Sequence, residues 1–99
     1  MKTKNVVPSC ASKLKVLADS TRLAVLEALM SGPQNVGELM EQLDVEQSLL
    51  SHHLALLREH GLVESQRDGK TMVYQLPASV TDSTAGKAIN LGCCKISFD

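Results

Sequence analysis

Residues 47–61, QSLLSHHLALLREHG, carry the clearest helical pattern in the chain. Drawn as a helix, this stretch places Leu50, Leu54 and Leu57 on one face, at the spacing that buries a stripe of side chains against a core. The opposite face consists of short or small side chains, namely Ser48, Ser51, His52, Ala55 and Glu59. The simplest interpretation of this helix alone is an amphipathic helix with a solvated polar face. In a major groove, however, its hydroxyls and imidazole could bond base edges or phosphates.

Two helices are expected at the start of the chain. Residues 1–7 are interpreted as a flexible tail, and residues 8–18 as a helix, since a proline suits the first helical turn. A second and strongly apolar helix should begin near Asp19 or Ser20, whose side chains can cap it, and end before Gly32.

A third helix is expected over residues 35–43. Asn35 and Glu38 have the spacing of a capping box, in which each side chain bonds the backbone of the other. The short turn at residues 44–46 then leads into the helix of residues 47–61. Two helices joined by so short a turn predict a helix-turn-helix.

After Gly61 the period of the apolar residues changes from helical to alternating. Residues 62–67 and 70–76 form two short extended runs around Asp68-Gly69, a dipeptide typical of tight hairpin turns. Arg67 and Lys70 flank the tip, where charges commonly serve only solubility. Beside a helix-turn-helix, a cationic hairpin is also typical of the wing of a winged helix, which contacts phosphates or the minor groove.

The C-terminal part is expected to form a last and weaker helix over residues 79–91. Gly92 would end it and leave residues 92–99 as a cysteine-bearing tail. With 2% aromatic residues the core must be built from Leu, Val, Ala and Met, which favours helices packed on helices. The sequence therefore predicts one domain over residues 1–99, mainly α with a small β-hairpin, in the winged helix-turn-helix order α-α-α-α-β-β-α.

Charge and apolar content restrict the partners and the compartment. The net charge of −1 gives no overall electrostatic reason to expect nucleic acid. No apolar run approaches the length of a membrane span, and the N-terminus lacks the apolar core of a signal peptide. We therefore expect a cytoplasmic protein without a membrane partner. In a reducing compartment its three cysteines are not expected to form structural disulfides, and their odd number leaves at least one thiol unpaired.

The run LADSTRLAVLEAL, followed by SHHLALLREHGLVESQRDGKTMVYQL, resembles the ArsR/SmtB family of winged-helix metalloregulatory repressors. The resemblance covers roughly residues 11–77. It rests on D-x-T-R at the start of the second helix, S-x-H-L and L-R-x-x-G-L in and after the fourth, and D-G-K at the wing turn. It implies a homodimer, with the first and last helices at its interface, that binds double-stranded operator DNA and releases it when an inducer is sensed.

The resemblance also assigns DNA-binding positions in the fourth helix and the wing. His53 lies nearer the apolar side of its helix and is expected to be packed. The residues suggested for the major groove are Gln47, Ser48, Ser51 and His52, and those for the wing are Arg67 and Lys70.

The sensing residues of the family are replaced in this chain. Arsenic-sensing members commonly carry E-L-C-V-C-D-L in the third helix, and the two cysteine positions are here Asn35 and Gly37. Zinc-sensing members often use Asp, His and Glu in the last helix, but no histidine follows His60. Both of these family sites are therefore expected to be absent.

Cys10, Cys93 and Cys94 remain as candidate ligands. Three thiolates suit a soft ion and match the three-coordinate complexes of trivalent arsenic or antimony, whereas the lack of nearby His or carboxylate partners disfavours a four-ligand zinc site in one subunit. Cys10 alone is more simply a small buried hydrophobe, but two adjacent cysteines near the end of the chain are difficult to bury together. We therefore expect a repressor that leaves its operator when these cysteines bind As(III) or Sb(III), without an organic cofactor.

Three alternatives remain open. A repressor of the same fold could respond to thiol redox state or persulfide through a bridge between Cys10 and one tail cysteine. A winged helix could also dock a protein without touching DNA. An enzyme is disfavoured, because no nucleophile lies beside a base and an orienting acid in a recognisable arrangement.

Overall fold

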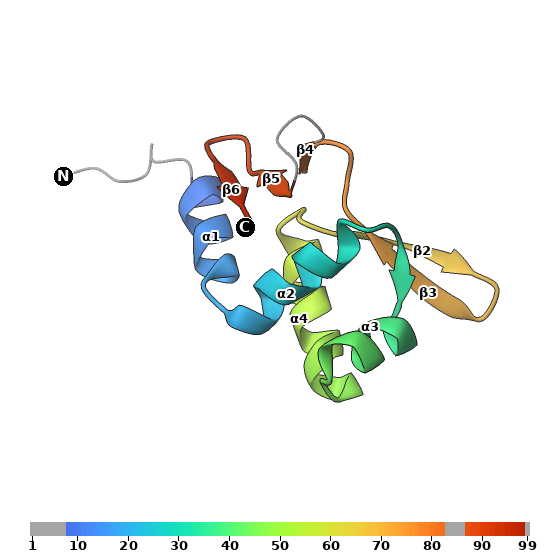
Figure 1. Cartoon of the computed structure of the whole chain (residues 1–99). Helices are drawn as coiled ribbons and strands as arrows, with labels where there is room; N and C mark the ends of the chain where they lie inside the picture. The colour runs from blue at the N-terminus through green and yellow to red at the C-terminus, as the bar shows by residue number, and fades with distance from the viewer. Residues whose placement is uncertain (1–7, 83–86, 99) are drawn as a thin grey trace.

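The computed structural model describes residues 8–82 and 87–98, and Figure 1 shows their arrangement. The helices are α1 (Pro8–Leu17), α2 (Ser20–Leu29), α3 (Val36–Leu43) and α4 (Gln47–Glu59). The strands are β1 (Gln34–Asn35), β2 (Glu64–Asp68), β3 (Thr71–Gln75), β4 (Thr81–Asp82), β5 (Ala88–Asn90) and β6 (Lys95–Ser97).

The predicted caps of α2 and α3 are confirmed. Asp19 accepts a hydrogen bond from the backbone amide of Arg22 at 3.0 Å and so caps α2. Asn35 and Glu38 form both bonds of the capping box, each at 2.8 Å. Asp44 ends α3 with a φ of 55°, a left-handed conformation that turns the chain toward α4. The helix-turn-helix therefore forms where the sequence predicts it.

The predicted hairpin is also confirmed, with its turn shifted by one residue. Asp68 pairs with Thr71, so the two loop residues are Gly69 and Lys70 rather than Asp68-Gly69. Gly69 has a φ of 66°, and a glycine in the first loop position is what a type II′ turn requires. The short strand β1, which the sequence pattern did not reveal, adds to β3 and gives a sheet of order β1-β3-β2.

The predicted last helix is wrong. Within residues 79–91 the described part contains β4 and β5, and the supposed tail contributes β6, so that a second antiparallel sheet of order β4-β5-β6 forms instead. The β-branched pair Ile89 and Ile96 faces across β5 and β6, which suits a sheet, whereas a glycine such as Gly86 costs a helix about 1 kcal/mol. Residues 83–86 of that predicted helix, and the expected tail of residues 1–7, lie outside the described residues.

The core is aliphatic, as the composition predicts. Its fully buried side chains come from α2, α3, α4 and the segment after α4. Ile89 of β5, with Val80 just before β4 and Leu91 just after β5, joins the same cluster. The largest fully buried side chains are Leu26, Leu39, Leu50, Leu54, Leu57, Leu62 and Ile89. In the described residues, no helix is both long enough and apolar enough to cross a membrane.

Candidate nucleic-acid interface and cysteine cluster

Helix α4 has one buried face and one exposed face. Leu50, Leu54 and Leu57 are 0% exposed and fix the orientation of the helix against the core. The four residues predicted for the major groove, Gln47, Ser48, Ser51 and His52, are all exposed. The structure therefore leaves this face open, and its contact with DNA stays a prediction.

The start of α4 has three features that the sequence pattern did not reveal. Ser48 donates a hydrogen bond to the Glu46 carboxylate at 2.6 Å. The hydroxyl of one predicted DNA-reading residue is therefore already bonded to an acidic side chain. Leu49 is 44% exposed beside it. An open hollow of about 540 Å³ lies here, lined by Glu46, Gln47, Ser48 and Ser51.

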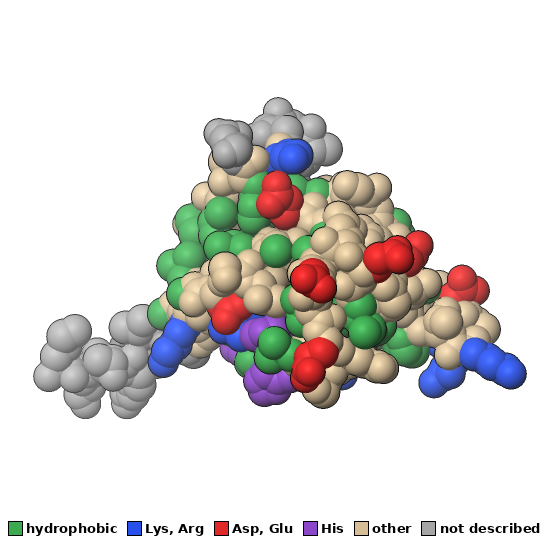
Figure 2. Space-filling model, turned by 60° about the horizontal axis from the view of Figure 1, so that its bottom comes forward, with side chains coloured by type: hydrophobic (Ala, Val, Ile, Leu, Met, Phe, Trp, Pro, Cys, Tyr) green, Lys and Arg blue, Asp and Glu red, His purple; other side chains and the backbone are tan. Residues whose placement is uncertain are grey.

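The predicted wing residues lie at the tip of the β2–β3 hairpin. Arg67 is the fourth residue of β2 and Lys70 lies in the loop, and both are exposed. Figure 2 shows Lys and Arg side chains projecting at the right of the molecule, the side on which Figure 1 has the hairpin tip. Histidine side chains lie lower on this view among scattered acidic groups. Lys and Arg side chains therefore lie at several separate places on this face, with one group projecting at its right edge.

His53 is packed, as the sequence predicts. It is 6% exposed, and its Nδ1 lies 3.0 Å from Nη1 of Arg22. Burial lowers the pKa of His53, and the positive charge of Arg22 acts in the same direction, whereas Asp19 opposes them. The hydrogen bond from the Arg22 amide lowers the pKa of Asp19. His53 is therefore held neutral inside the protein rather than available to DNA.

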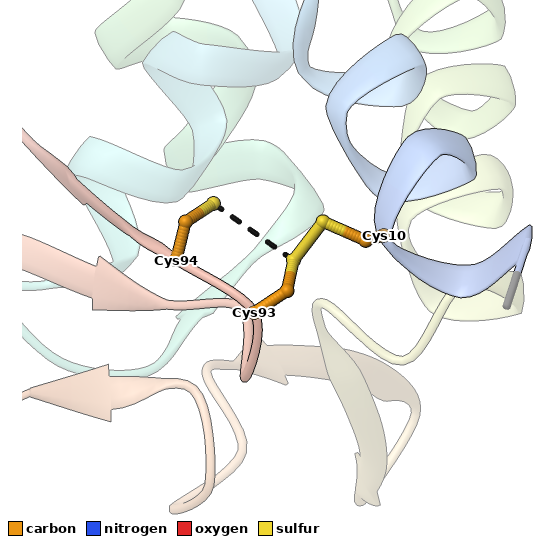
Figure 3. Close-up of side chains that lie close together, drawn as sticks. All are labelled: Cys10, Cys93 and Cys94. Atoms are coloured by element: carbon orange, nitrogen blue, oxygen red, sulfur yellow. Dashed lines mark hydrogen bonds between the residues drawn. A yellow bond between two sulfur atoms is a disulfide. The ribbon is translucent and has the colours of Figure 1, made fainter. Parts of the chain in front are cut away.

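The three cysteines come together in one chain, as Figure 3 shows. Cys10 lies in the first turn of α1, and Cys93 and Cys94 lie between β5 and β6. Their three Sγ atoms are all within 4.8 Å of one another. The described residues that form this group offer sulfur donors only.

Cys10 and Cys93 are joined by a disulfide, with their Cα atoms 6.1 Å apart. The expectation that the cysteines form no disulfide is therefore wrong for this pair, because the second sheet brings Cys93 against α1. Cys94 remains a free, exposed thiol, and its Sγ lies 3.9 Å from that of Cys93. Since the bonded Cys93 carries no thiol hydrogen, Cys94 is the donor in this contact.

A tight turn holds Cys93 at the tip of the β5–β6 hairpin. The amide of Leu91 donates to the carbonyl of Cys94 at 2.8 Å, so Gly92 and Cys93 form a two-residue loop. Gly92 has a φ of 92°, and its amide donates to the Asn90 side chain at 2.8 Å. On the α1 side, Lys13 donates to the Leu91 carbonyl at 3.4 Å. Gly92 is a turn signal in the sequence, but the prediction of a helix over residues 79–91 assigned it to the end of that helix rather than to a hairpin turn.

The cluster can exist in two chemical states. With the disulfide formed, α1 is covalently tied to the β5–β6 hairpin and one thiol is left. With the disulfide reduced, three thiols lie close together and match the donor preference of a soft, three-coordinate ion. A change of state therefore alters how α1 is held.

A family model described as "Bacterial regulatory protein, arsR family" matches residues 19–65. The transcriptional regulator NmtR of Mycobacterium tuberculosis is 46% identical over 66 residues, which cover 67% of this chain and 55% of NmtR. The arsenical resistance operon repressor of Staphylococcus aureus is 38% identical over 69 residues, covering 70% of this chain and 66% of that protein.

The solved structure of HlyU from Vibrio cholerae has a TM-score of 0.70 and 36% identity, and the match covers 77% of this chain and 83% of that one. In sequence, the transcriptional activator HlyU of Vibrio cholerae is 41% identical over 66 residues, which cover 67% of this chain and 61% of HlyU. The match thus spans little more than half of NmtR and about three fifths of HlyU. With its winged helix-turn-helix fold, the chain belongs to the ArsR family of bacterial regulatory proteins.

Proposed function

We propose that this chain is a DNA-binding transcriptional repressor that leaves its operator when Cys10, Cys93 and Cys94 bind trivalent arsenic or antimony. The observation that carries the proposal is the approach of three Sγ atoms to within 4.8 Å of one another. The family supports the DNA-binding part, and the similarity to an arsenical resistance repressor agrees with the inducer.

Binding of the inducer requires three thiols. The Cys10–Cys93 disulfide must first accept two electrons and two protons from a cellular thiol reductant. Three thiols and arsenous acid then form three As–S bonds and release three molecules of water. Since a lone pair leaves trivalent arsenic with three ligands in a pyramid, the donor number of the cluster suits it better than it suits tetrahedral zinc.

The DNA-binding surface of the proposal consists of α4 and the wing. Gln47, Ser48, Ser51 and His52 would enter the major groove, and Arg67 and Lys70 would contact phosphates or the minor groove. Because phosphate contacts release counterions, Arg67→Ala and Lys70→Ala should each lower the slope of log K against log salt by about 1. Lys87→Ala, which changes an exposed lysine paired with Glu27, is the control and should leave the slope unchanged.

The repressor is proposed to act as a homodimer. Leu14 of α1 is 43% exposed, so an apolar side chain on this helix is available to a partner surface. A dimer reads two half-sites about 34–36 Å apart, so a small change in how the subunits are held misplaces one α4 helix. In this chain the C-terminal segment beside α1 is the β5–β6 hairpin, to which Cys10 and Lys13 connect α1.

A second candidate function is a repressor that responds to thiol redox state or persulfide. The Cys10–Cys93 disulfide favours it, because it is a bridge between the first helix and the C-terminal segment. Its formation removes two electrons and two protons from two thiols, which a peroxide or a persulfide can accept. Cys94 has no required part in this switch.

The test is fluorescence anisotropy of the reduced protein on DNA from upstream of its own gene, titrated separately with arsenite, zinc and a persulfide donor. Release by arsenite that is lost in Cys94→Ser supports the metalloid sensor. Release by the persulfide donor alone, kept in Cys94→Ser and lost in Cys93→Ser, supports the redox switch. Ser97→Ala, in the same hairpin, is the control. Absence of DNA binding under all conditions would overturn the repressor and favour a protein-docking module.

A further inference from the structure

Arg22 lies where α1, α2 and α4 meet. Its backbone amide donates to Asp19 at the start of α2, and its Nη1 lies 3.9 Å from the Asp19 carboxylate. Its Nε donates to the carbonyl of Val16 in the last turn of α1, and its Nη1 lies 3.0 Å from Nδ1 of His53 in α4. The Arg22 side chain is 15% exposed, so water competes little for these bonds. One side chain therefore ties three helices together.

The direction of the Arg22–His53 bond fixes the state of the histidine. A guanidinium only donates, so Nδ1 of His53 must accept and the ring proton must be on Nε2. The groups that act on His53 are Asp19 and Arg22 at the start of α2 and His52 on its own helix. Protonation of Nδ1 would replace the bond with a repulsion between two cations. The contact is thus available only to the neutral imidazole.

The space around Arg22 separates α1 from α4. A cavity of about 280 Å³ lies there, lined by Ser12, Lys15, Val16, Arg22, Leu56 and His60. Open space between two helices leaves room for one to shift relative to the other. The Arg22 side chain connects them, because it bonds Val16 in α1 and His53 in α4. Displacement of the end of α1 therefore reaches α4 through this side chain.

The two ends of this path carry the proposed sensor and the proposed reader. Cys10 lies in the first turn of α1, whose last turn holds Val16. His53 is adjacent in sequence to His52, which is exposed on the proposed reading face, and their ring centroids are 5.9 Å apart. A helix of ten residues is about 15 Å long. If α1 moves as one rigid unit, a displacement of its first turn also displaces its last turn.

We propose that Arg22 and His53 are positioning residues that transmit the bonding state of Cys10 to the recognition helix α4. The inference rests on the proposed function, because it requires DNA binding that depends on the cysteines. The bonding state sets the position of α1, the carbonyl of Val16 carries that position to Arg22, and the hydrogen bond to His53 carries it to α4.

The experiment compares operator affinity of the reduced and the Cys10–Cys93-bridged protein by anisotropy, with the bridge verified by mass spectrometry. In the wild type we expect the two affinities to differ by about 5- to 150-fold, the range of ordinary allosteric coupling. In His53→Leu and Arg22→Gln the ratio should fall to within about two-fold of one. His53→Gln, whose amide oxygen can still accept from Arg22, should keep most of the wild-type ratio.

Matched controls exist at the end of the same helix. His60→Gln changes a histidine just after α4 whose Nδ1 lies 3.0 Å from the Leu56 carbonyl oxygen, and Arg58→Gln changes an arginine with a 3.4 Å bond to Ser65 at the surface. Both should keep the wild-type ratio. Retention of that ratio in His53→Leu and Arg22→Gln would overturn the transmission alone. Equal affinities of the two wild-type states would likewise overturn the transmission, whereas absence of operator binding in both states would overturn the proposed function.

A measurement on the wild type keeps the inference testable if these variants do not fold. The ring nitrogen resonances of the histidines report which nitrogen carries the proton. We expect His53 to be protonated on Nε2, and its Nδ1 resonance to shift between the reduced and bridged states while that of His60 stays in place. An Nδ1-protonated His53, or a resonance that is identical in the two states, would overturn the transmission.

Discussion

The thiol of Cys94 lies 3.9 Å from the sulfur of Cys93, which is bonded to Cys10. The disulfide needs two sulfurs, and the third lies beside it without taking part. This third sulfur distinguishes the two proposed inducers, because a redox bridge uses two of the cysteines and a trivalent metalloid uses all three.

Cys94→Ser should therefore separate metalloid binding from bridge formation. We expect the variant to form the Cys10–Cys93 bridge on oxidation, since neither bonded sulfur is changed. After reduction, it should bind arsenite at least about ten-fold more weakly than the wild type, because loss of one As–S bond exceeds the ~1.4 kcal/mol that a factor of ten requires. Mass spectrometry after alkylation checks the bridge, and ultraviolet absorption of the arsenic–sulfur bonds checks binding. Equal arsenite affinity of variant and wild type would show that Cys94 is not a ligand.

Ile89→Ala should destabilise the fold and loosen the cysteine cluster together. Ile89 is 0% exposed and anchors β5 in the core, two residues before the turn that carries Cys93. Truncation of a fully buried isoleucine costs about 2–5 kcal/mol. Urea unfolding measures this loss, and the rate of bridge formation under a fixed oxidant should fall with it.

Ile96→Ala is the control for this prediction. Ile96 pairs with Ile89 across the hairpin but is only partly buried, so the same truncation removes fewer core contacts. A cost for Ile96→Ala equal to that for Ile89→Ala would show that the second sheet is not anchored through β5.

The helix-turn-helix was predictable from local signals, and the C-terminal sheet was not. Asp19, Asn35 and Glu38 act on backbone groups within three residues of themselves, so their spacing in the sequence is sufficient evidence for the caps. The second sheet depends on contacts between strands, such as Ile89 with Ile96, and on burial against a core assembled from distant residues. A window of sequence does not contain that information.

The same distinction applies to the candidate site. The three cysteines could be selected by their chemistry alone, but their approach depends on the β5–β6 turn, which the helical interpretation of residues 79–91 excluded. The Arg22–His53 contact joins residues 31 positions apart. The sequence predicts that His53 is packed, because it lies near the apolar face of α4, but it gives no indication of its partner.

The lowered pKa of His53 predicts that the free energy of unfolding decreases as the pH falls through the range just below neutrality. Burial lowers the pKa of His53 in the folded state, so the unfolded chain takes up a proton first, near its ordinary pKa of about 6.5. The free energy of unfolding should therefore decrease as the pH falls from about 6.5 to the lower pKa of the folded state, and then level off as far as this group is concerned. Asp19, whose pKa is lowered from 3.8, acts only at more acidic pH.

Urea unfolding measured between about pH 5 and pH 8 checks this dependence. His53→Gln should remove the part of the slope that His53 contributes, because the amide does not titrate. Ser97→Ala, which changes no titrating group, should leave the slope as it is in the wild type. A wild-type slope that persists in His53→Gln would assign the pH dependence to another group.

Glu46→Gln should strengthen operator binding. The Glu46 carboxylate caps no amide of α4, and it accepts a hydrogen bond from Ser48, one of the proposed reading residues. A negative charge there opposes the phosphates, and two unit charges about 4 Å apart in water interact by about 1 kcal/mol, so its removal should raise affinity on the order of five-fold at low salt. Because salt screens this repulsion, the gain should shrink as ionic strength rises.

Anisotropy over a salt series measures the gain in operator affinity of Glu46→Gln. The control is Glu27→Gln on α2, which changes an exposed glutamate paired with Lys87. Unchanged affinity of Glu46→Gln at low salt would place the start of α4 away from the DNA backbone and would contradict the proposed roles of Gln47 and Ser48.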